Sequence, residues 1–272
     1  MAAEKRVTHD DFAAPPGDRW KRYVVGSGAL EATGRTLLFI NNRTSARRYS
    51  NAQLDDYQGV TRRCLSWRPP LKLKVRARFS HEAGELLGTA GFGFWNDPFG
   101  MTGRRRPALP RVVWFFYASP PSNMKLDLNT PGHGWKAATL DTMRLPFFLL
   151  APTAPLAVPL MNVRPLYCRL WPIAQRAIGV SEAALEIPMT GWHTYVIDWG
   201  TEGVSFSVDG RQVLKSGSSP RGPLGLVMWF DNQYAVVTPW GRFGYGLLES
   251  YEKQWMEVDS LSIDAGRGET KT

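Results

Sequence analysis

The sequence predicts an all-β fold: a jelly-roll sandwich of two antiparallel sheets, interrupted by one apolar insertion. Turn formers are plentiful, with 26 Gly and 20 Pro among 272 residues, and 11 residues are Trp. This composition is typical of short strands joined by tight turns. Apolar stretches of strand length also follow one another without helical patterns between them, which favours a sandwich over a fold of alternating helices and strands.

The strands are expected to form a single domain over residues 19–266. Residues 1–18 are polar and contain two adjacent prolines, so we expect a loose leader there, and residues 267–272 are expected to be a tail. A domain of this size is long, but it lies within the range of all-β sandwiches. Residues 43–57 are polar and are expected to form a loop.

The clearest strand covers residues 71–79, where apolar side chains alternate with Lys and Arg. This period of two indicates a strand with one buried face and one cationic face in water. In residues 91–95 glycines take alternate positions, which leaves one face bare and lets another group approach the backbone. Residues 112–117 are continuously apolar, as in a central strand.

Later segments complete the predicted sandwich. Residues 203–208 and 211–214 flank Asp209-Gly210, which is a strong signal for a two-residue hairpin turn. Further strands are expected at residues 36–40, 192–199, 224–230 and 255–263.

An uncharged apolar segment between Arg144 and Arg164 breaks the strand pattern. It lies in an insertion predicted over residues 141–187. The segment is long enough to span a bilayer, but each of its four prolines would remove a helix hydrogen bond, so no spanning helix is expected. Three arrangements stay open: packing over the sandwich, a lid over a cleft, or peripheral contact with a membrane surface through residues 145–163.

Charge and cysteine content restrict the classes of partner and site. The net charge of +9 permits an acidic partner, but no helix-turn-helix, zinc-finger or RNA-binding signature is present, so no nucleic-acid partner is expected. Cys64 and Cys168 lie far apart and the four His residues are scattered, so no metal site is predicted. The N-terminus has no apolar signal-peptide core, which favours a cytoplasmic protein, with association to a membrane periphery as the alternative.

Three blocks of sequence resemble the laminarinase-like family 16 glycoside hydrolases. Residues 192–199 (WHTYVIDW) are similar to the family's W/F-H-x-Y-x-I/V-x-W strand, residues 204–210 (VSFSVDG) to the next strand and its turn, and residues 258–263 (VDSLSI) to the closing strand. The resemblance implies a concanavalin A-like lectin/glucanase fold, with two sheets curved around a cleft that binds sugar chains. No cofactor is predicted: a structural calcium ion is compatible with this fold, but no loop in the sequence shows a calcium-binding pattern.

The strand in the place of the family's catalytic strand departs from the family pattern. The family uses an E-x-D-x-x-E strand, because retaining hydrolysis needs a nucleophile and a general acid/base about 5 Å apart. Residues 112–118 (VVWFFYA) contain no carboxylate, and no Asp or Glu occurs between Asp97 and Asp127. The usual catalytic pair is therefore missing from its usual place, and the fold alone cannot restore the activity.

Aromatic side chains stand in place of these acids and predict an aromatic cleft, because rings stack on sugar faces and also hold apolar molecules. If alternation holds, Trp114 and Phe116 share one face of the strand and Phe115 and Tyr117 share the other, so only one pair can line the cleft. Core packing of all four rings is the alternative. The predicted ligand-binding residues are Trp95, Asn96, Trp114, Phe115, Phe116, Tyr117, Trp229, Asp231, Asn232 and Gln233.

Four titratable residues are candidates for catalysis. Asp97 follows the strand at 91–95, Asp127 alternates with two leucines, and Asp231 opens a polar run after Trp229. His133 lies in a Gly-rich turn and could transfer protons near neutral pH. Each has a structural alternative, as the cap of a turn or as a solvated side chain.

Three functions stay open on the sequence alone. The first is a binding protein, or an enzyme of unusual mechanism, that holds a glycan or an apolar metabolite in the aromatic cleft. The second is a carbohydrate-active hydrolase or lyase whose acids have been relocated to positions such as Asp97, Asp127 and Asp231. The third is an interaction protein at the periphery of a membrane.

Overall fold

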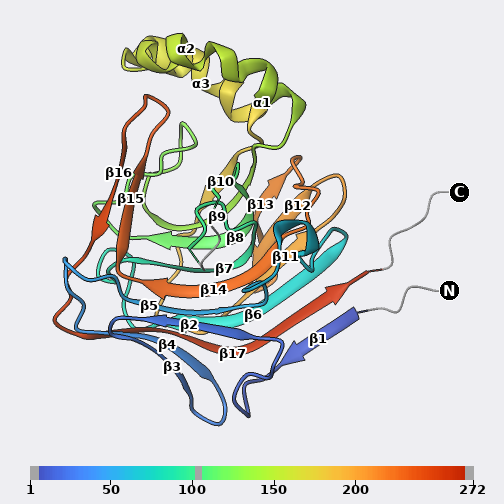
Figure 1. The fold of residues 1–272 in the computed structure, drawn as a ribbon, viewed down its shortest axis with the longest axis vertical. Coiled ribbons are helices and arrows are strands. Elements are labelled where there is room, and N and C mark those ends of the chain that lie inside the picture. Colours follow the sequence, from blue (N-terminus) through green and yellow to red (C-terminus); the bar gives the residue numbers. More distant parts are fainter. Residues whose placement is uncertain (1–5, 102–105, 267–272) are drawn as a thin grey trace, which may run out of the picture.

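The structure, a computed structural model, describes residues 6–101 and 106–266 (Figure 1). Two antiparallel sheets stack face to face, which confirms the predicted jelly-roll sandwich. The outer sheet consists of β13 (Arg211–Ser216), β12 (Val204–Val208), β11 (His193–Trp199), β6 (Leu71–Phe79), β17 (Lys253–Ala265), β4 (Leu37–Asn42) and β3 (Gly28–Ala32), with β1 (Arg6–Asp10) paired to β17. The cleft sheet consists of β10 (Ser181–Ala184), β9 (Gly134–Asp141), β8 (Arg111–Ala118), β7 (Thr89–Trp95), β14 (Gly225–Asp231), β5 (Asn51–Asp55) and β2 (Lys21–Val25). Outside the two sheets lie the hairpin of β15 (Gln233–Val237) and β16 (Phe243–Leu247) and the 3-10 turn η1 (Arg62–Cys64).

The alternation predicted along β6 is confirmed. Its apolar side chains are buried and its cationic side chains face outward. On that outer face the guanidinium groups of Arg76 and Arg78 lie 4.7 and 4.8 Å from the ring of Trp192. The hairpin turn between β12 and β13 is also confirmed, because Asp209 and Gly210 both have positive φ, as this turn type requires.

Aromatic rings from both sheets form the centre of the core. Phe92 on β7 and Phe115 on β8 come from the cleft sheet, and Tyr195 on β11 and Phe206 on β12 come from the outer sheet. The ring centroids of Phe115 and Tyr195 are 5.1 Å apart, those of Phe92 and Tyr195 5.2 Å, and those of Phe115 and Phe206 5.3 Å. Rings at these spacings add edge-to-face contacts to the burial of large apolar areas, so this cluster holds the two sheets together.

The N-terminal segment is part of the domain, so the prediction of a loose leader over residues 1–18 was wrong for the residues that the structure describes. Strand β1 pairs along its whole length with β17. Phe12 and Trp20 are buried in the core, and the Trp20 indole donates to Asp10 Oδ2 at 2.9 Å. Residues 1–5 and the predicted tail at 267–272 lie outside the described residues.

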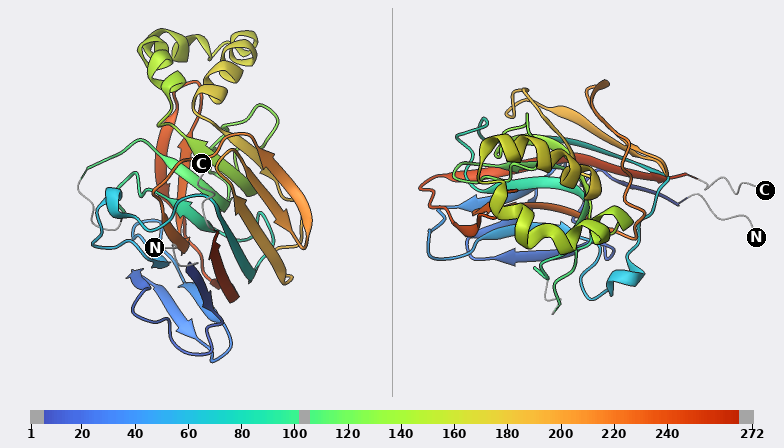
Figure 2. Two further views of the ribbon diagram at one scale, coloured as in Figure 1. Left: turned by 90° about the vertical axis from the view of Figure 1, so that its right-hand side faces the viewer. Right: turned by 90° about the horizontal axis from the view of Figure 1, so that it is seen from above.

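The apolar insertion between β9 and β10 is helical. It contains α1 (Leu145–Leu150), a 3-10 turn η2 (Ala151–Thr153), α2 (Ala154–Leu160) and α3 (Arg164–Ala177). A proline stands in the first turn of each of these four elements. At that position the backbone N–H has no partner within the helix, so a proline without an N–H costs no hydrogen bond. The prolines thus divide the segment into short helices. Residues 143–178, here called the helical cap, form a layer at one end of the sandwich, and hairpin β15–β16 rises toward it (Figures 1 and 2).

Across the ranges 6–101 and 106–266, no helix is both long enough and apolar enough to cross a membrane.

Substitutions at neighbouring positions of β8 should differ sharply in their effect on stability. Phe115 is fully buried between the sheets, whereas Phe116 points the other way and is partly exposed. We expect Phe115→Ala to lower the free energy of unfolding by about 3–5 kcal/mol and Phe116→Ala by roughly 1–2 kcal/mol, measured by denaturant titration. Equal losses would contradict the assignment of the two faces.

Candidate functional site

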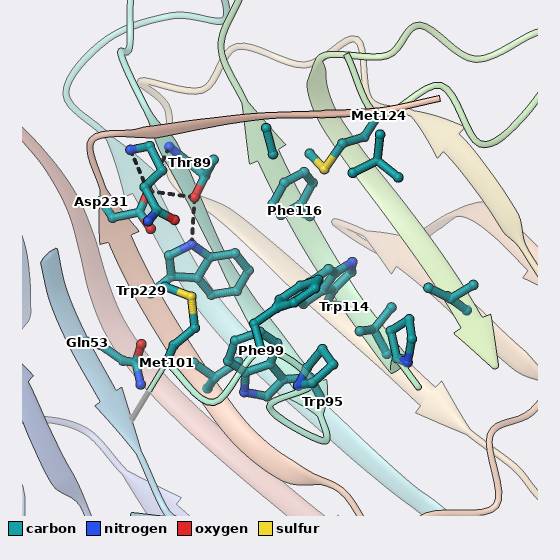
Figure 3. A pocket seen from close by; sticks show the side chains of 18 of the residues that line it. Gln53, Thr89, Trp95, Phe99, Met101, Trp114, Phe116, Met124, Trp229 and Asp231 are labelled. Atoms are coloured by element: carbon teal, nitrogen blue, oxygen red, sulfur yellow. Dashed lines mark hydrogen bonds between the residues drawn. The ribbon is translucent and has the colours of Figure 1, made fainter. Parts of the chain in front are cut away.

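A pocket of about 240 Å³ lies on the face of the cleft sheet that points away from the core. Trp114 and Phe116 on β8 line it together with Trp95 on β7 and Trp229 on β14 (Figure 3). The β8 pair is the one that alternation leaves facing outward, since Phe115 and Tyr117 are buried on the other side. Phe115 and Tyr117, predicted as ligand-binding residues, therefore belong to the core, while Trp114 and Phe116 are at the pocket.

The four pocket rings form one continuous aromatic wall. Trp95 and Trp229 are parallel within 7°, with centroids 6.5 Å apart. Trp114 lies 5.2 Å from both Phe116 and Trp229. Because aromatic pairs at these distances attract one another, the contacts between neighbouring rings stabilise the wall.

Two glycines of β7 make room for this wall. A Cβ atom on Gly91 would lie 2.9 Å from Cη2 of Trp229, and one on Gly93 would lie 2.6 Å from Cβ of Trp114. Both distances are too short for a real side chain, so glycine at 91 gives the ring of Trp229 room over β7, and glycine at 93 allows β8 to approach closely at Trp114. The prediction that this strand leaves a bare face is confirmed. The groups that approach it are the backbone of β8 at both glycines and, at Gly91, the ring of Trp229 as well.

Two of the indole N–H groups of the wall are already engaged within the protein. Trp229 Nε1 donates to Thr89 Oγ1 at 2.9 Å, and Trp95 Nε1 donates to the Tyr57 hydroxyl at 2.7 Å. Trp95 and Trp229 therefore offer a ligand ring surface and no free donor.

Asp231 forms the centre of a polar side of the pocket. Its Oδ1 accepts hydrogen bonds from Thr89 Oγ1 at 2.8 Å and from the Gln233 amide at 3.0 Å, and its Oδ2 accepts one from the Tyr49 hydroxyl at 3.4 Å. Burial raises the pKa of Asp231 to about 6, although these hydrogen bonds act in the opposite direction. Gln53 lies on the same side of the pocket as Asp231, across from Trp114 (Figure 3). Gln233 also lines the pocket.

Two of the predicted ligand-binding residues have structural roles. Asn96 is buried, and its Oδ1 accepts from the Arg111 amide while its Nδ2 donates to the Leu109 carbonyl. Asn232 is also buried, and its Nδ2 donates to three backbone carbonyls at 3.1 Å each. Neither side chain lines the pocket.

Of the four candidate catalytic residues, only Asp231 reaches the pocket. Asp97 is buried in a turn, where its Oδ1 accepts from the Met101 amide. Asp127 lies in a loop rather than a strand and caps it by accepting from the Asn129 amide, and His133 is exposed in the turn before β9. The structure thus separates the acids that a relocated catalytic pair would need. Of the described residues lining the pocket, Asp231 alone carries a carboxyl group.

Sequence reasoning missed the polar residues that β5 and β7 supply. Residues 43–57 were expected to form a loop, but residues 51–55 form the fully buried strand β5, which places Gln53 in the pocket. The polar strand can be buried because its side chains bind one another: Gln53 Nε2 donates to Asp55 Oδ2 at 2.8 Å. This explains why a polar segment predicted as a loop is a buried strand. The polar composition of β5 gave no strand signal in the sequence. Its pairing with β14 joins residues far apart in the chain, so it could not be predicted from neighbouring residues.

A buried ion pair beside the pocket was also missed. Lys136 Nζ lies 3.3 Å from Glu182 Oε2, and both side chains are almost completely buried. Lys136 is the register partner of Phe116, so both point to the same side of the sheet. Burial raises the pKa of Glu182 and lowers the pKa of Lys136, because desolvation disfavours each charge.

Within the described part of the chain, no three His, Cys, Asp or Glu side chains come together in a way that could hold a metal ion.

Comparison with known proteins identifies the fold. No family model and no curated protein matches the sequence. A prokaryotic β-1,3-1,4-glucanase (lichenase) derived from a mouse hindgut metagenome is 11% identical with a TM-score of 0.53, and the match covers 96% of this chain and 99% of that one. Laminarinase from Flavobacterium sp. UMI-01 is 11% identical (TM-score 0.50, 94% and 98% covered), and a Crh5 transglycosylase in complex with NAG is 13% identical (TM-score 0.50, 96% and 84% covered). At such identities the likeness establishes the jelly-roll fold.

The titration of Asp231 should be visible in the stability of the protein. Its pKa is raised from 3.8 to about 6 in the folded state, so its stabilising contribution is complete below pH 3.8 and is lost as the pH rises through about 6. Between pH 4 and pH 7 the parent should therefore lose about 2 kcal/mol of unfolding free energy through Asp231. Asp231→Asn lacks this titration, so its unfolding free energy should rise by that amount relative to the parent.

Asp127→Asn is the matched control. Burial alone would raise the pKa of Asp127, but hydrogen bonds from Asn129, Gln175 and Thr130 outweigh it and hold the pKa below its ordinary value. This variant should show no such relative gain over the same pH range. A flat difference between Asp231→Asn and the parent would mean that Asp231 titrates as an ordinary exposed acid.

Proposed function

We propose that this protein binds an apolar small molecule that carries one polar group. The observation that supports this most strongly is the distribution of groups around the pocket. Aromatic and aliphatic side chains form most of its lining. The polar side chains Gln53, Thr89 and Asp231 lie on one side (Figure 3), and the backbone amide of Gln233, another lining residue, donates to Asp231. A mostly apolar cavity with a few converging polar groups is the usual composition of a small-molecule site.

The distribution of hydrogen-bonding groups favours such a ligand over a sugar chain. Sugars carry hydroxyl groups around the whole ring, and each hydroxyl that is buried without a partner costs free energy. The wall formed by Trp95, Trp114, Phe116 and Trp229 offers rings, and the indole donors of Trp95 and Trp229 are already used. An apolar body would lie against this wall, with its polar group directed toward Asp231.

The carboxyl groups of the pocket do not support retaining glycoside hydrolysis. That reaction needs two carboxyl groups about 5 Å apart across the scissile bond. Asp231 has no second carboxyl group among the described lining residues, and β8 contains none in its sequence. In the proposed role, a protonated Asp231 donates a hydrogen bond to the polar group of the ligand, since its raised pKa favours the protonated form in mildly acidic solution.

Glycan binding is the second candidate. The observation in its favour is the aromatic wall itself, because flat rings stack on the apolar faces of sugars. The structures of similar fold include two glucanases and a transglycosylase in complex with NAG, which adds weight to this candidate.

One binding experiment separates the two candidates. The neutral dye N-phenyl-1-naphthylamine fluoresces in apolar sites, and its displacement reports on other ligands. We expect geraniol and farnesol, apolar chains with one hydroxyl group, to displace the dye, and a laminarin oligosaccharide to leave it bound. Displacement by the oligosaccharide alone would support glycan binding and would refute the proposed apolar ligand.

Two tryptophan variants test whether the ligand binds in this pocket. Trp114→Ala removes a ring from the wall and should weaken dye and farnesol binding by about 10- to 100-fold, judged from the apolar area lost. Trp192→Ala removes a ring of the same size from the outer face of the other sheet, where it contacts Arg76 and Arg78, and should bind like the parent. Equal binding by both folded variants would place the ligand elsewhere.

A further inference from the structure

The helical cap exposes apolar side chains that soluble proteins usually bury. Leu145, Leu149 and Leu156 are 71, 70 and 73% exposed. Phe148, Leu160 and Val163 of the same layer are exposed as well. A layer that exposes several large apolar side chains is a candidate site of interaction with a membrane or another protein.

The charges of the cap are all of one sign. From residue 142 to residue 180 the sequence contains four arginines and no Asp or Glu. Arg164, Arg169 and Arg176 are exposed on α3, whereas Tyr167 and Trp171 on the opposite side of that helix are buried. A helix layer that combines exposed Leu and Phe with arginines has the composition of segments that lie in a membrane interface.

The positive charge continues where the cap meets the tip of hairpin β15–β16. A hollow at this junction is lined by Lys125, Arg164 and Arg242 beside the ring of Trp240, and no lining residue carries a carboxyl group. The guanidinium groups of Arg164 and Arg242 make no hydrogen bond or ion pair with any residue that the structure describes. They remain available to anionic groups from outside the chain.

Packing holds this surface in a fixed position. Tyr167 packs edge-on against Trp240, with ring centroids 5.3 Å apart, and Asn162 Nδ2 donates to the Trp240 carbonyl at 3.3 Å. Trp171 Nε1 donates to the Leu126 carbonyl at 3.0 Å. The exposed leucines and the arginines therefore belong to a layer anchored to the hairpin and to the loop beneath it.

We propose that the helical cap docks on an anionic lipid bilayer, with the apolar side chains of α1 and α2 in the interface and the arginines against lipid phosphates. Such a surface accepts both kinds of side chain, because apolar groups enter the acyl boundary and cations meet the negative headgroups. A second copy of the chain fits less well, since two caps would bring together the exposed Arg164, Arg169 and Arg176 of each copy, and residues 142–180 contain no Asp or Glu to pair with them. This proposal does not depend on what the pocket holds.

Vesicle flotation with the full chain tests the proposal. The parent protein should float with phosphatidylcholine vesicles that contain phosphatidylglycerol, should bind pure phosphatidylcholine at least tenfold more weakly, and should be released by high salt. Arg164→Glu/Arg169→Glu should weaken binding to the anionic vesicles by at least about 30-fold, given the contribution expected of each arginine near such a surface. Leu149→Ser/Leu156→Ser should weaken binding as well while leaving the salt dependence in place.

The matched control reverses two arginines at the opposite end of the molecule. Arg22 and Arg35 are exposed near β2 and β3, far from the cap (Figure 1), and Arg22→Glu/Arg35→Glu should bind vesicles like the parent. Trp114→Ala should also keep full vesicle binding, so a failure of the pocket proposal would be seen separately.

No flotation of the parent, or equal loss in the cap and control variants, would overturn the proposal. A dimer by light scattering that the Leu149→Ser/Leu156→Ser variant abolishes, without flotation, would assign the surface to a second copy instead.

Discussion

Strict alternation along β8 is the constraint on which the rest of the structure depends. The strand carries four consecutive aromatic residues, and neighbouring side chains of a strand cannot turn to the same face. Phe115 enters the core, where it packs against Tyr195 and Phe206 of the outer sheet and holds the two sheets together. Trp114 and Phe116 must then face the other way, where they meet Trp229. The same contact that fixes the stacking of the sheets therefore decides which rings line the pocket.

The parts of the fold that follow a short-range pattern could be predicted from the sequence. The alternation along β6, the Asp209-Gly210 turn and the two faces of β8 are of this kind. Strand β1 could not be predicted, because its partner β17 lies more than 240 positions away and its own five residues carry no strong pattern. The pocket depends partly on short-range patterns and partly on contacts between distant residues. Trp229 and Asp231 were found from their neighbours in sequence, but the hydrogen bond from Thr89 to Asp231 joins residues 142 positions apart.

The pocket lies on a jelly-roll scaffold and is lined mainly by aromatic and aliphatic side chains. Glycines on β7 give the ring of Trp229 room and allow β8 to approach closely at Trp114, where the cleft face carries its wall of rings. Polar groups are confined to one side, where buried Asp231 is held by Thr89, Gln233 and Tyr49. A fold shared with glucanases does not by itself carry their activity, since function resides in the groups that line the site. An apolar ligand and a membrane-facing cap would be complementary, because a bilayer is a natural reservoir of apolar molecules, yet each proposal can stand without the other.

Untargeted mass spectrometry of small molecules extracted from natively purified protein tests the central claim most directly. The parent protein and the Trp192→Ala variant should both release the same apolar compound bearing one polar group, and Trp114→Ala, which alters the pocket wall, should release much less of it. Recovery of a glycan that depends on Trp114, or of an apolar compound in equal amounts from all three proteins, would contradict the assignment of this pocket as an apolar ligand site.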